Sequence, residues 1–270
     1  MIRHLKAEIP ALLAFRGPDA VRFLNGQLTQ DVRNLGADAR LSCITDAKGR
    51  LQFTVSVFQG DDESDIRVAG PSGRAVEIIA RLERYLIADE VEIEDLTGRW
   101  VRVHAEGPLE GAAFARTAAG PFGEGVDHWY PCGSEPDDDP ISDDEAETLR
   151  VSAGIPAWGR ELEEGMLPPE AGLDRHAIGY DKGCYIGQEV LSRIKSVGRV
   201  NRRLARFSTD ATRPAPLMDE EGEVGHLTSV SPGASEDGSR AALGYLRKRS
   251  FDREHFNTPD GSGVAFIGWA

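Results

Sequence analysis

One ten-residue stretch, DKGCYIGQEV, gathers the side chains most capable of chemistry. It contains Lys182, Gly183, Cys184, Tyr185, Gly187, Gln188 and Glu189. The thiolate is the nucleophilic form of cysteine, and a nearby ammonium group favours it, so Lys182 could activate Cys184. The glycines would let a ligand or a second backbone approach closely. The alternative interpretation is a small core side chain, because free cysteines are among the most buried residues.

The amide of Gln188 and the carboxylate of Glu189 suit a different task. An amide both donates and accepts hydrogen bonds, and a carboxylate only accepts, so together they could bind a heterocycle with amino and carbonyl edges. A turn residue and a surface acid are the alternative. The nearest histidine, His176, has no spacing that identifies it as a base for Cys184. The residues alone therefore indicate a candidate thiol without a catalytic triad.

The sequence pattern predicts neither a metal site nor a disulfide within the chain. The three cysteines, at 43, 132 and 184, are far apart with no CxxC pair, and the six histidines show no HExxH spacing. Free cysteines are typical of a reducing compartment, so we expect a cytoplasmic protein. No apolar run is long enough for a signal peptide or a membrane span, and we expect a soluble protein without a membrane partner.

The charge balance excludes some partners and leaves one open. The 45 acidic and 31 basic side chains give a net charge of -14, which argues against direct binding to nucleic acid in general. Between residues 191 and 208 the chain has six basic residues and no acid: Arg193, Lys195, Arg199, Arg202, Arg203 and Arg206. This stretch is either a solvated strand edge or a patch for a polyanionic ligand tail.

The elements that must position these residues mix helices and strands. A helix is predicted over residues 18–28, a hairpin over 41–58 around the turn DAKGR, and a second helix over 73–87. On that second helix Val76, Ile79, Leu82 and Leu86 would form the buried face. Two strands joined through Gly98 are predicted to follow.

The second half begins with breakers and ends with strands. Prolines, glycines and acids predict a loop over residues 120–140. Ser142 and Glu145 form a capping box for a helix that ends at Gly154. Residues 155–183 read as a long ordered loop, the kind of segment that often lines a site. Short strands after residue 200 predict a small barrel or sandwich, with a domain boundary there.

The octapeptide KGCYIGQE resembles the signature of the YgfZ family of folate-binding proteins, relatives of the glycine-cleavage T-protein. Weaker matches occur in family order along nearly the whole chain: FLNGQLTQDV, DAKGR, RYLIADEVEIEDL and RVSAGIP. The resemblance implies an α+β fold, a ring of three modules. Residues 1–200 would form a folate-binding, T-protein-like region of two interleaved α/β subdomains, and residues 201–270 a small C-terminal β-barrel.

The resemblance also implies a function. Tetrahydrofolate or a derivative would bind in the central opening, and Cys184 would be the functional thiol. The protein would be an accessory factor for the assembly or maintenance of iron-sulfur proteins, including enzymes that modify tRNA. Its partners would be a reduced folate and either iron-sulfur proteins or their assembly machinery.

Two departures separate this chain from the T-protein itself. The catalytic aspartate of the T-protein falls near Phe53 and Thr54, and its pterin-binding glutamate falls at Ser152, two residues after Arg150. A folate-dependent aminomethyltransferase or other one-carbon transferase is therefore the alternative function, and a non-catalytic adaptor is a third. Besides the catalytic pair Cys184 and Lys182, the expected folate residues are Glu170, Asp174, Gly183, Tyr185, Gly187, Gln188, Glu189 and Arg199.

Overall fold

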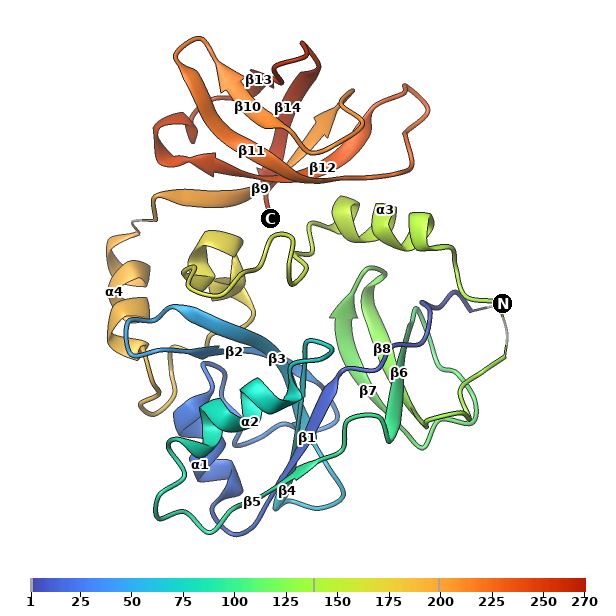
Figure 1. Ribbon diagram of the computed structural model, residues 1–270, viewed down its shortest axis with the longest axis vertical. Helices are drawn as coiled ribbons and strands as arrows, with labels where there is room; N and C mark the ends of the chain where they lie inside the picture. Colours follow the sequence, from blue (N-terminus) through green and yellow to red (C-terminus); the bar gives the residue numbers. More distant parts are fainter. Residues whose placement is uncertain (1, 138, 199) are drawn as a thin grey trace.

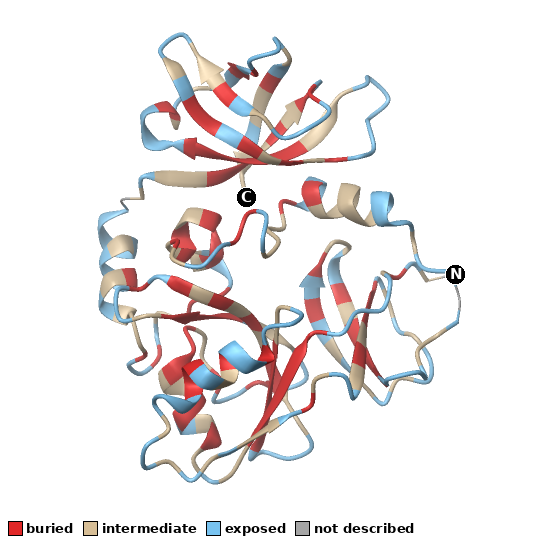
Figure 2. Ribbon diagram, viewed as in Figure 1, coloured by how far each residue is buried: buried red, intermediate tan, exposed pale blue. Residues whose placement is uncertain are grey.

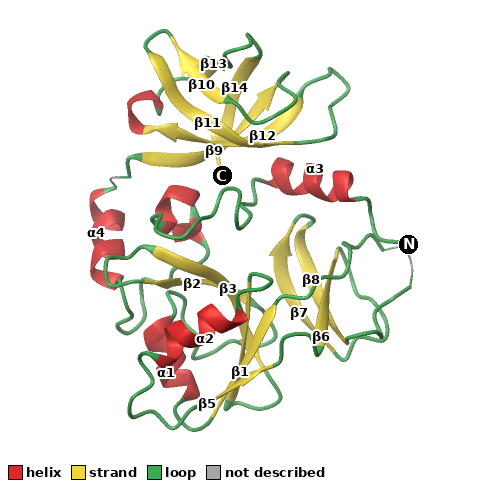
Figure 3. Ribbon diagram, in the orientation of Figure 1, coloured by secondary structure: helices red, strands yellow, loops and turns green. Residues whose placement is uncertain are grey.

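Three β-structures make up most of the fold, and the segment that carries the octapeptide lies at the left edge of the view, beside one of them (Figure 1). The computed structural model describes residues 2–137, 139–198 and 200–270. A five-stranded sheet, a three-stranded sheet and a closed six-stranded barrel account for the named strands of these ranges. Figure 3 shows that the helices are few. The predicted α+β fold with a C-terminal barrel is confirmed.

The five-stranded sheet has the strand order β2-β3-β4-β1-β5. Its strands are β1 (Ala11–Arg16), β2 (Arg40–Thr45), β3 (Leu51–Gln59), β4 (Asp65–Gly70) and β5 (Glu92–Asp95). All of its pairings are antiparallel. Helices α1 (Ala20–Gln27) and α2 (Ala75–Glu83) pack on it and share its apolar core, seen as buried strands in Figure 2. The predicted hairpin and both predicted helices are confirmed.

The predicted buried face of α2 is partly wrong. Val76 is 74% exposed, whereas Ala75, Ile78 and Leu82 are buried. Residues 75, 78 and 82 also recur at helical spacing, and this face is the one that meets the sheet. A fourth residue on the buried side of α2 is a cation, Arg81.

The three-stranded sheet corrects two expectations. It contains β6 (Trp100–Ala105), β7 (Phe114–Gly120) and β8 (Gly123–Pro131) in the order β6-β8-β7. The predicted loop over residues 120–140 is wrong for β8, because only Pro121 and Phe122 form the turn before it, and Gly123 and Gly125 belong to a strand that buries Trp129 and Tyr130. The two strands predicted around Gly98 both exist, but β5 joins the first sheet and β6 the second.

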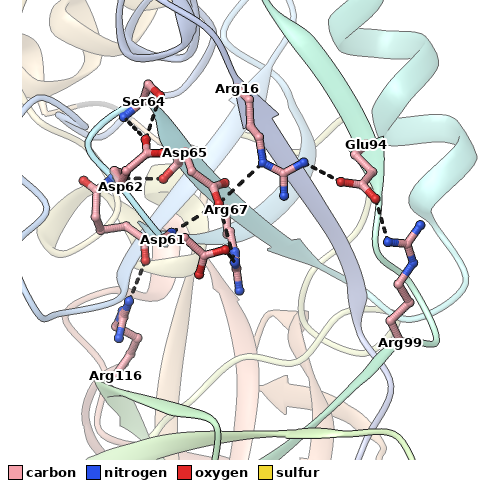
Figure 4. Close-up of polar contacts among 10 residues, drawn as sticks. Arg16, Asp61, Asp62, Ser64, Asp65, Arg67, Glu94, Arg99 and Arg116 are labelled. Carbon is pink, nitrogen blue, oxygen red and sulfur yellow. Dashed lines mark hydrogen bonds and ion pairs between the residues drawn. The ribbon is translucent and has the colours of Figure 1, made fainter.

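Figure 4 shows a chain of ion pairs that fastens β1, β4 and β5 together. In order, it runs through Arg99, Glu94, Arg16, Asp65, Arg67 and Asp61. Asp65 and Arg67 are buried, where an unpaired charge would be costly. Arg67 also lies 5.0 Å from the ring centroid of Phe114 in β7, so this cluster connects the two sheets.

Helix α3 (Asp143–Ala153) follows the predicted capping rules. The Ser142 hydroxyl accepts a hydrogen bond from the Glu145 N–H over 3.1 Å, and Gly154 ends the helix at a φ of 78°. The chain then continues as the predicted long loop, interrupted by the short 3₁₀ helices η1 (Pro168–Ala171) and η2 (Leu173–Arg175). Helix α4 (Gln188–Val197) closes the segment.

The barrel has the strand order β10-β11-β12-β9-β14-β13 and closes on itself. Its elements are β9 (Arg202–Thr209), β10 (Pro216–Asp219), β11 (Gly222–Val230), β12 (Arg240–Arg247), the 3₁₀ helix η3 (Lys248–Ser250), β13 (His255–Asn257) and β14 (Gly263–Trp269). Side chains such as Phe207, Leu227 and Phe256 fill its interior. Closure removes the open sheet edges that invite aggregation. Among the described residues, no helix is long and apolar enough to cross a membrane.

Candidate functional site

Cys184 lies on an exposed loop just before α4. Two hydrogen bonds hold the following backbone: the Ile186 N–H donates to the Gly26 carbonyl over 3.2 Å, and Thr45 Oγ1 donates to the Ile186 carbonyl over 2.6 Å. The loop is thereby attached to the last turn of α1 and the end of β2. The structure rejects the interpretation of Cys184 as a core residue and supports a solvent-accessible thiol.

Lys182 fastens the other end of this loop. Its buried ammonium group donates to the carbonyl oxygens of Asn25, Leu28 and Gln30 over 2.7 to 2.8 Å. Asn25 and Leu28 lie at the C-terminal end of α1, where carbonyl oxygens lack helical partners and a cation is favourable. Burial lowers the pKa of Lys182 to about 8. All three of its hydrogens are used, so Lys182 positions the loop and has no hydrogen left for the thiol of Cys184.

Gly187 is required by the close approach of two predicted motifs. Its φ is 88°, and a Cβ there would lie 2.6 Å from the Asp46 carbonyl oxygen and 2.8 Å from Gly49 Cα. Both contacts belong to the DAKGR turn, in which Asp46 Oδ1 accepts from the N–H groups of residues 48 and 50. The turn and the octapeptide, about 140 positions apart in sequence, therefore form one unit.

The remaining octapeptide residues face different surroundings. Gly183 is exposed, whereas Tyr185 is buried with a hydroxyl that has no partner among the described residues. Burial raises the pKa of that hydroxyl well above its usual value. Gln188 begins α4, and Glu189 is an exposed helix residue whose carboxylate pairs with Arg193 over 2.9 Å. The surface-acid interpretation of Glu189 is thus the one its surroundings favour.

The basic stretch is largely engaged with the protein itself. Arg202 pairs with Glu170 over 2.8 Å and with Glu163 over 3.1 Å, and Arg203 lies over the ring of Trp269. These contacts leave Glu170 committed to an ion pair. Arg199, the last predicted folate residue, falls outside the described residues, and its role stays a prediction.

A cavity of about 520 Å³ lies beside α4, and Asp174 and Lys182 contribute to its wall. Its charged lining residues are Asp31, Asp174, Asp181, Arg175, Lys182 and Lys195. Lys195 Nζ lies 3.6 Å from the ring centroid of Tyr180. Its three carboxylates and three cations do not by themselves select a ligand class, and its buried cation, Lys182, already donates all of its hydrogens to backbone carbonyls.

A second cavity, of about 510 Å³, lies against α2 and is called the α2 cavity below. Its lining residues are Gln52, Phe53, Arg74, Glu77, Ala80, Arg81, Arg84, Trp158, Gly159, Leu162, Glu163 and Glu164. The rings of Phe53 and Trp158 stack with centroids 5.9 Å apart and planes 23° apart. They provide an aromatic wall of the kind on which a flat heterocycle can stack.

Arg81 is the unusual residue of the α2 cavity. It is 4% exposed, and its guanidinium donates to neutral acceptors: Gln52 Oε1, Gln27 Oε1 at 3.1 Å and the Thr45 carbonyl at 2.7 Å. Within the described ranges it forms no ion pair with a carboxylate. Since a guanidinium has five N–H groups, two remain without an acceptor there. Burial lowers the pKa of Arg81, and buried cations are normally paired, so the cavity offers a site for an anionic group.

The loop that carries Trp158 is anchored to the barrel by Glu161. This buried carboxylate accepts from Arg150 Nη1 at 2.9 Å, from Thr228 Oγ1 at 2.8 Å and from Ser229 Oγ at 2.6 Å. Burial alone would raise the pKa of Glu161, but these bonds outweigh it and the pKa lies below its usual value. The C-terminal barrel therefore holds the aromatic wall of the α2 cavity in place through Glu161.

The residues of the α2 cavity fit a folate better than a metal. An aromatic wall, the amide of Gln52 and the spare N–H groups of Arg81 match a flat heterocycle with polar edges and a carboxylate. Within the described part of the chain, no group of three or more His, Cys, Asp or Glu side chains could hold a metal ion.

None of the predicted folate residues that the structure describes lines the α2 cavity. Arg81 and Trp158 could not be selected from sequence, because a cation on an amphipathic helix normally faces solvent and a loop tryptophan normally packs in a core. Arg81 interrupts the apolar face of α2, and that was the one available signal.

The architecture is that of an aminomethyltransferase. The chain superposes on the glycine cleavage system aminomethyltransferase T from Bartonella henselae with a TM-score of 0.78 over 96% of this chain and 82% of that one, at 18% identity. No family model matches the chain.

Sequence relatives narrow the class to a family. The tRNA-modifying protein YgfZ of Klebsiella pneumoniae is 30% identical over 245 residues, which cover 79% of this chain and 73% of that protein. A mitochondrial homolog of the iron-sulfur cluster assembly factor IBA57 from Cryptococcus neoformans is 26% identical, over 87% of this chain and 72% of its own. A putative chloroplastic transferase of Arabidopsis thaliana is 36% identical over 38% of this chain, and the match spans 24% of that longer protein. The chain belongs to the YgfZ family, as its octapeptide indicates.

Proposed function

We propose that this protein is a folate-binding accessory factor for the assembly or maintenance of iron-sulfur proteins, with Cys184 as its functional thiol. The observation that carries the proposal is the exposed Cys184 on a loop fixed by Lys182 and Thr45. The contacts of Lys182 and Ile186 fix the backbone on both sides of this thiol, which is exposed and which packing does not need. The names of the relatives, which refer to iron-sulfur assembly and tRNA modification, support the same role.

The α2 cavity is the proposed folate site. Phe53 and Trp158 would contact the pteridine ring, Gln52 would bind a polar edge, and Arg81 would hold an anionic group. A reduced folate, when bound, would supply a carrier for one-carbon units. The chain's own residues would bind and orient it, while Glu161 keeps the loop of Trp158 in place.

An aminomethyltransferase activity is less well supported. Strand β3, which follows the DAKGR turn, has the sequence LQFTVSVFQ and contributes Gln52 and Phe53 to the cavity but no carboxylate. The place of the T-protein's catalytic aspartate is thus taken by Phe53 and Thr54, and a general base is missing there. Client proteins and a cytoplasmic location stay predictions, since some relatives are named as mitochondrial or chloroplastic.

The thiol is tested by complementation with a matched control. Cells that lack their own YgfZ-type factor would receive the native chain, Cys184→Ser or Cys132→Ser, because residues 132 and 184 are the two exposed cysteines. We expect Cys132→Ser to restore the activity of iron-sulfur enzymes and Cys184→Ser to fail at equal protein level. Equal rescue by both variants would refute the role of the thiol.

The folate site is tested by calorimetry with tetrahydrofolate and its 5-formyl derivative. Trp158→Ala removes half of the aromatic wall and should weaken binding about tenfold, since stacking contributes about 0.5 to 1.5 kcal/mol beyond the area buried. Trp269→Ala, in the barrel, should leave the affinity unchanged. If neither folate gives a heat of binding at millimolar concentration, and neither reduces the heat measured for the other, the folate part of the proposal is wrong.

A further inference from the structure

The α2 cavity and the Cys184 loop meet at one residue, Thr45. Its carbonyl accepts a hydrogen bond from Arg81 Nη2 over 2.7 Å, and its hydroxyl donates to the Ile186 carbonyl over 2.6 Å. Ile186 lies two residues after Cys184. A single threonine at the end of β2 therefore contacts the cation of the cavity with its backbone and the thiol loop with its side chain.

A second route reaches the same residue. Arg81 Nη1 donates to Gln27 Oε1 over 3.1 Å, and the neighbouring Gly26 accepts from the Ile186 N–H over 3.2 Å. The carbonyl of Ile186 is thus held by Thr45, which accepts from Arg81, and its N–H is held by Gly26, the neighbour of the other acceptor Gln27. Gly187, directly after, also contacts Thr45, since a Cβ at that glycine would lie 2.8 Å from Thr45 Oγ1.

The positive charge of Arg81 would let the link between the α2 cavity and the Cys184 loop respond to an anionic ligand. A buried guanidinium with only neutral acceptors and two spare N–H groups is held less firmly than one paired with a carboxylate. A carboxylate bound to those N–H groups would fix the guanidinium and, through it, the carbonyl of Thr45 and the amide of Gln27. Ligand binding would then order the backbone at Ile186.

We propose that the α2 cavity and the Cys184 loop are thermodynamically coupled, so that a carboxylate-bearing ligand held by Arg81 orders the backbone that presents the thiol. The proposal rests on the proposed folate site and adds a regulatory link: the loop distinguishes the loaded protein from the empty one. Couplings between two sites typically correspond to a factor of about 5 to 150 in affinity, and they act equally in both directions.

Hydrogen exchange measures the coupling at the amide involved. Peptides that cover residues 183–190 would be followed with and without saturating 5-formyltetrahydrofolate, with peptides from β11 as a reference for global stabilisation. We expect the ligand to slow exchange of the loop peptides at least about fivefold relative to the reference. Thr45→Val removes the hydroxyl at nearly constant shape, and Thr45 does not line the cavity. This variant should still bind the folate, with an affinity weakened by no more than the coupling factor, but lose at least half of the loop's response.

Two further variants separate coupling from general damage. Thr45→Ser keeps the hydroxyl and should restore the response, whereas Thr117→Val, at an exposed position of β7, should not affect it. Modification of the loop gives an independent measurement: alkylation of Cys184 with iodoacetamide, in a Cys132→Ser chain, should change the folate Kd, because the coupling acts in both directions.

The outcomes distinguish the two proposals. Folate binding without any change in loop exchange, or a full response in Thr45→Val, would overturn the coupling and leave the folate site intact. Absence of folate binding to the native chain would overturn both.

Discussion

Replacing Gly187 by alanine tests the claim that the octapeptide and the DAKGR turn form one packed unit. The new Cβ would adopt a φ of 88° and meet the Asp46 carbonyl oxygen at 2.6 Å and Gly49 Cα at 2.8 Å. Both neighbours are backbone atoms of a hydrogen-bonded turn, so they cannot rotate away as a flexible side chain would.

The expected loss follows from two separate costs. A left-handed conformation costs a non-glycine residue about 1 to 2 kcal/mol, and overpacking costs about 1 to 3 kcal/mol, so Gly187→Ala should lower the free energy of unfolding by about 2 to 5 kcal/mol. Native domains are stable by only about 5 to 15 kcal/mol, so this loss is large. Urea titration would measure it as a lower midpoint at unchanged slope.

Gly183→Ala is the matched control within the same octapeptide. Its φ is not in the left-handed region, and the nearest atom to a Cβ there is Asn25 Nδ2 at 4.0 Å. This substitution should change the free energy of unfolding by no more than about 1 kcal/mol, in either direction. If the two alanine variants differ by less than about 1 kcal/mol, the close packing of Gly187 on the turn does not determine its identity.

Three further outcomes follow from burial and charge. The pKa of Lys182 is lowered to about 8 in the folded protein, so between pH 8 and 10.5 this lysine carries its proton only when the chain is unfolded. The free energy of unfolding of the native chain should therefore rise with pH in that window, by at most about 3 kcal/mol. Urea titrations of both chains should show that Lys182→Met abolishes this rise. Mass spectrometry after alkylation at pH 7.5 should find Cys132 and Cys184 modified. Cys43 is buried and its pKa is raised to about 12, so it should react only in denaturant. Rapid modification of Cys43 in the native protein would contradict the structure. Glu161→Gln should weaken folate binding and shift the tryptophan emission of the free protein. The reason is that a neutral amide pairs poorly with Arg150, which frees the loop of Trp158. An unchanged spectrum and an unchanged affinity would show that Glu161 does not position this loop.

Much of the local structure was predictable because its causes are local. The capping box at Ser142, the turn chemistry of Asp46 and Gly49, and the alternating strands after residue 200 each depend on residues within a few positions of one another. The octapeptide identified the family for a related reason, since a short contiguous motif keeps its meaning wherever the chain places it. The exposed thiol of Cys184 was among its predictions.

The wrong predictions, for the buried face of α2 and for the start of β8, arose where the same residue pattern is compatible with two structures. On α2, residues 76, 79 and 82 and residues 75, 78 and 82 both recur at helical spacing, and only the position of the sheet decides which face is buried. Around the start of β8, glycines and a proline suggested a loop, although Pro121 lies in a two-residue hairpin turn and Gly123 and Gly125 belong to the strand that buries Trp129.

The candidate site depended most on tertiary structure. Lys182 looked like an activator of the neighbouring thiol, but the end of α1 supplies three carbonyl oxygens that take all its hydrogens. Arg81 looked like any helix cation, but Gln27, Gln52 and Thr45 from three other elements enclose it, and it forms no ion pair with a described residue. The sequence determined which groups the chain carries and how each short segment folds. Which groups meet was decided by packing between segments 29 to 157 positions apart, a separation at which no local propensity acts.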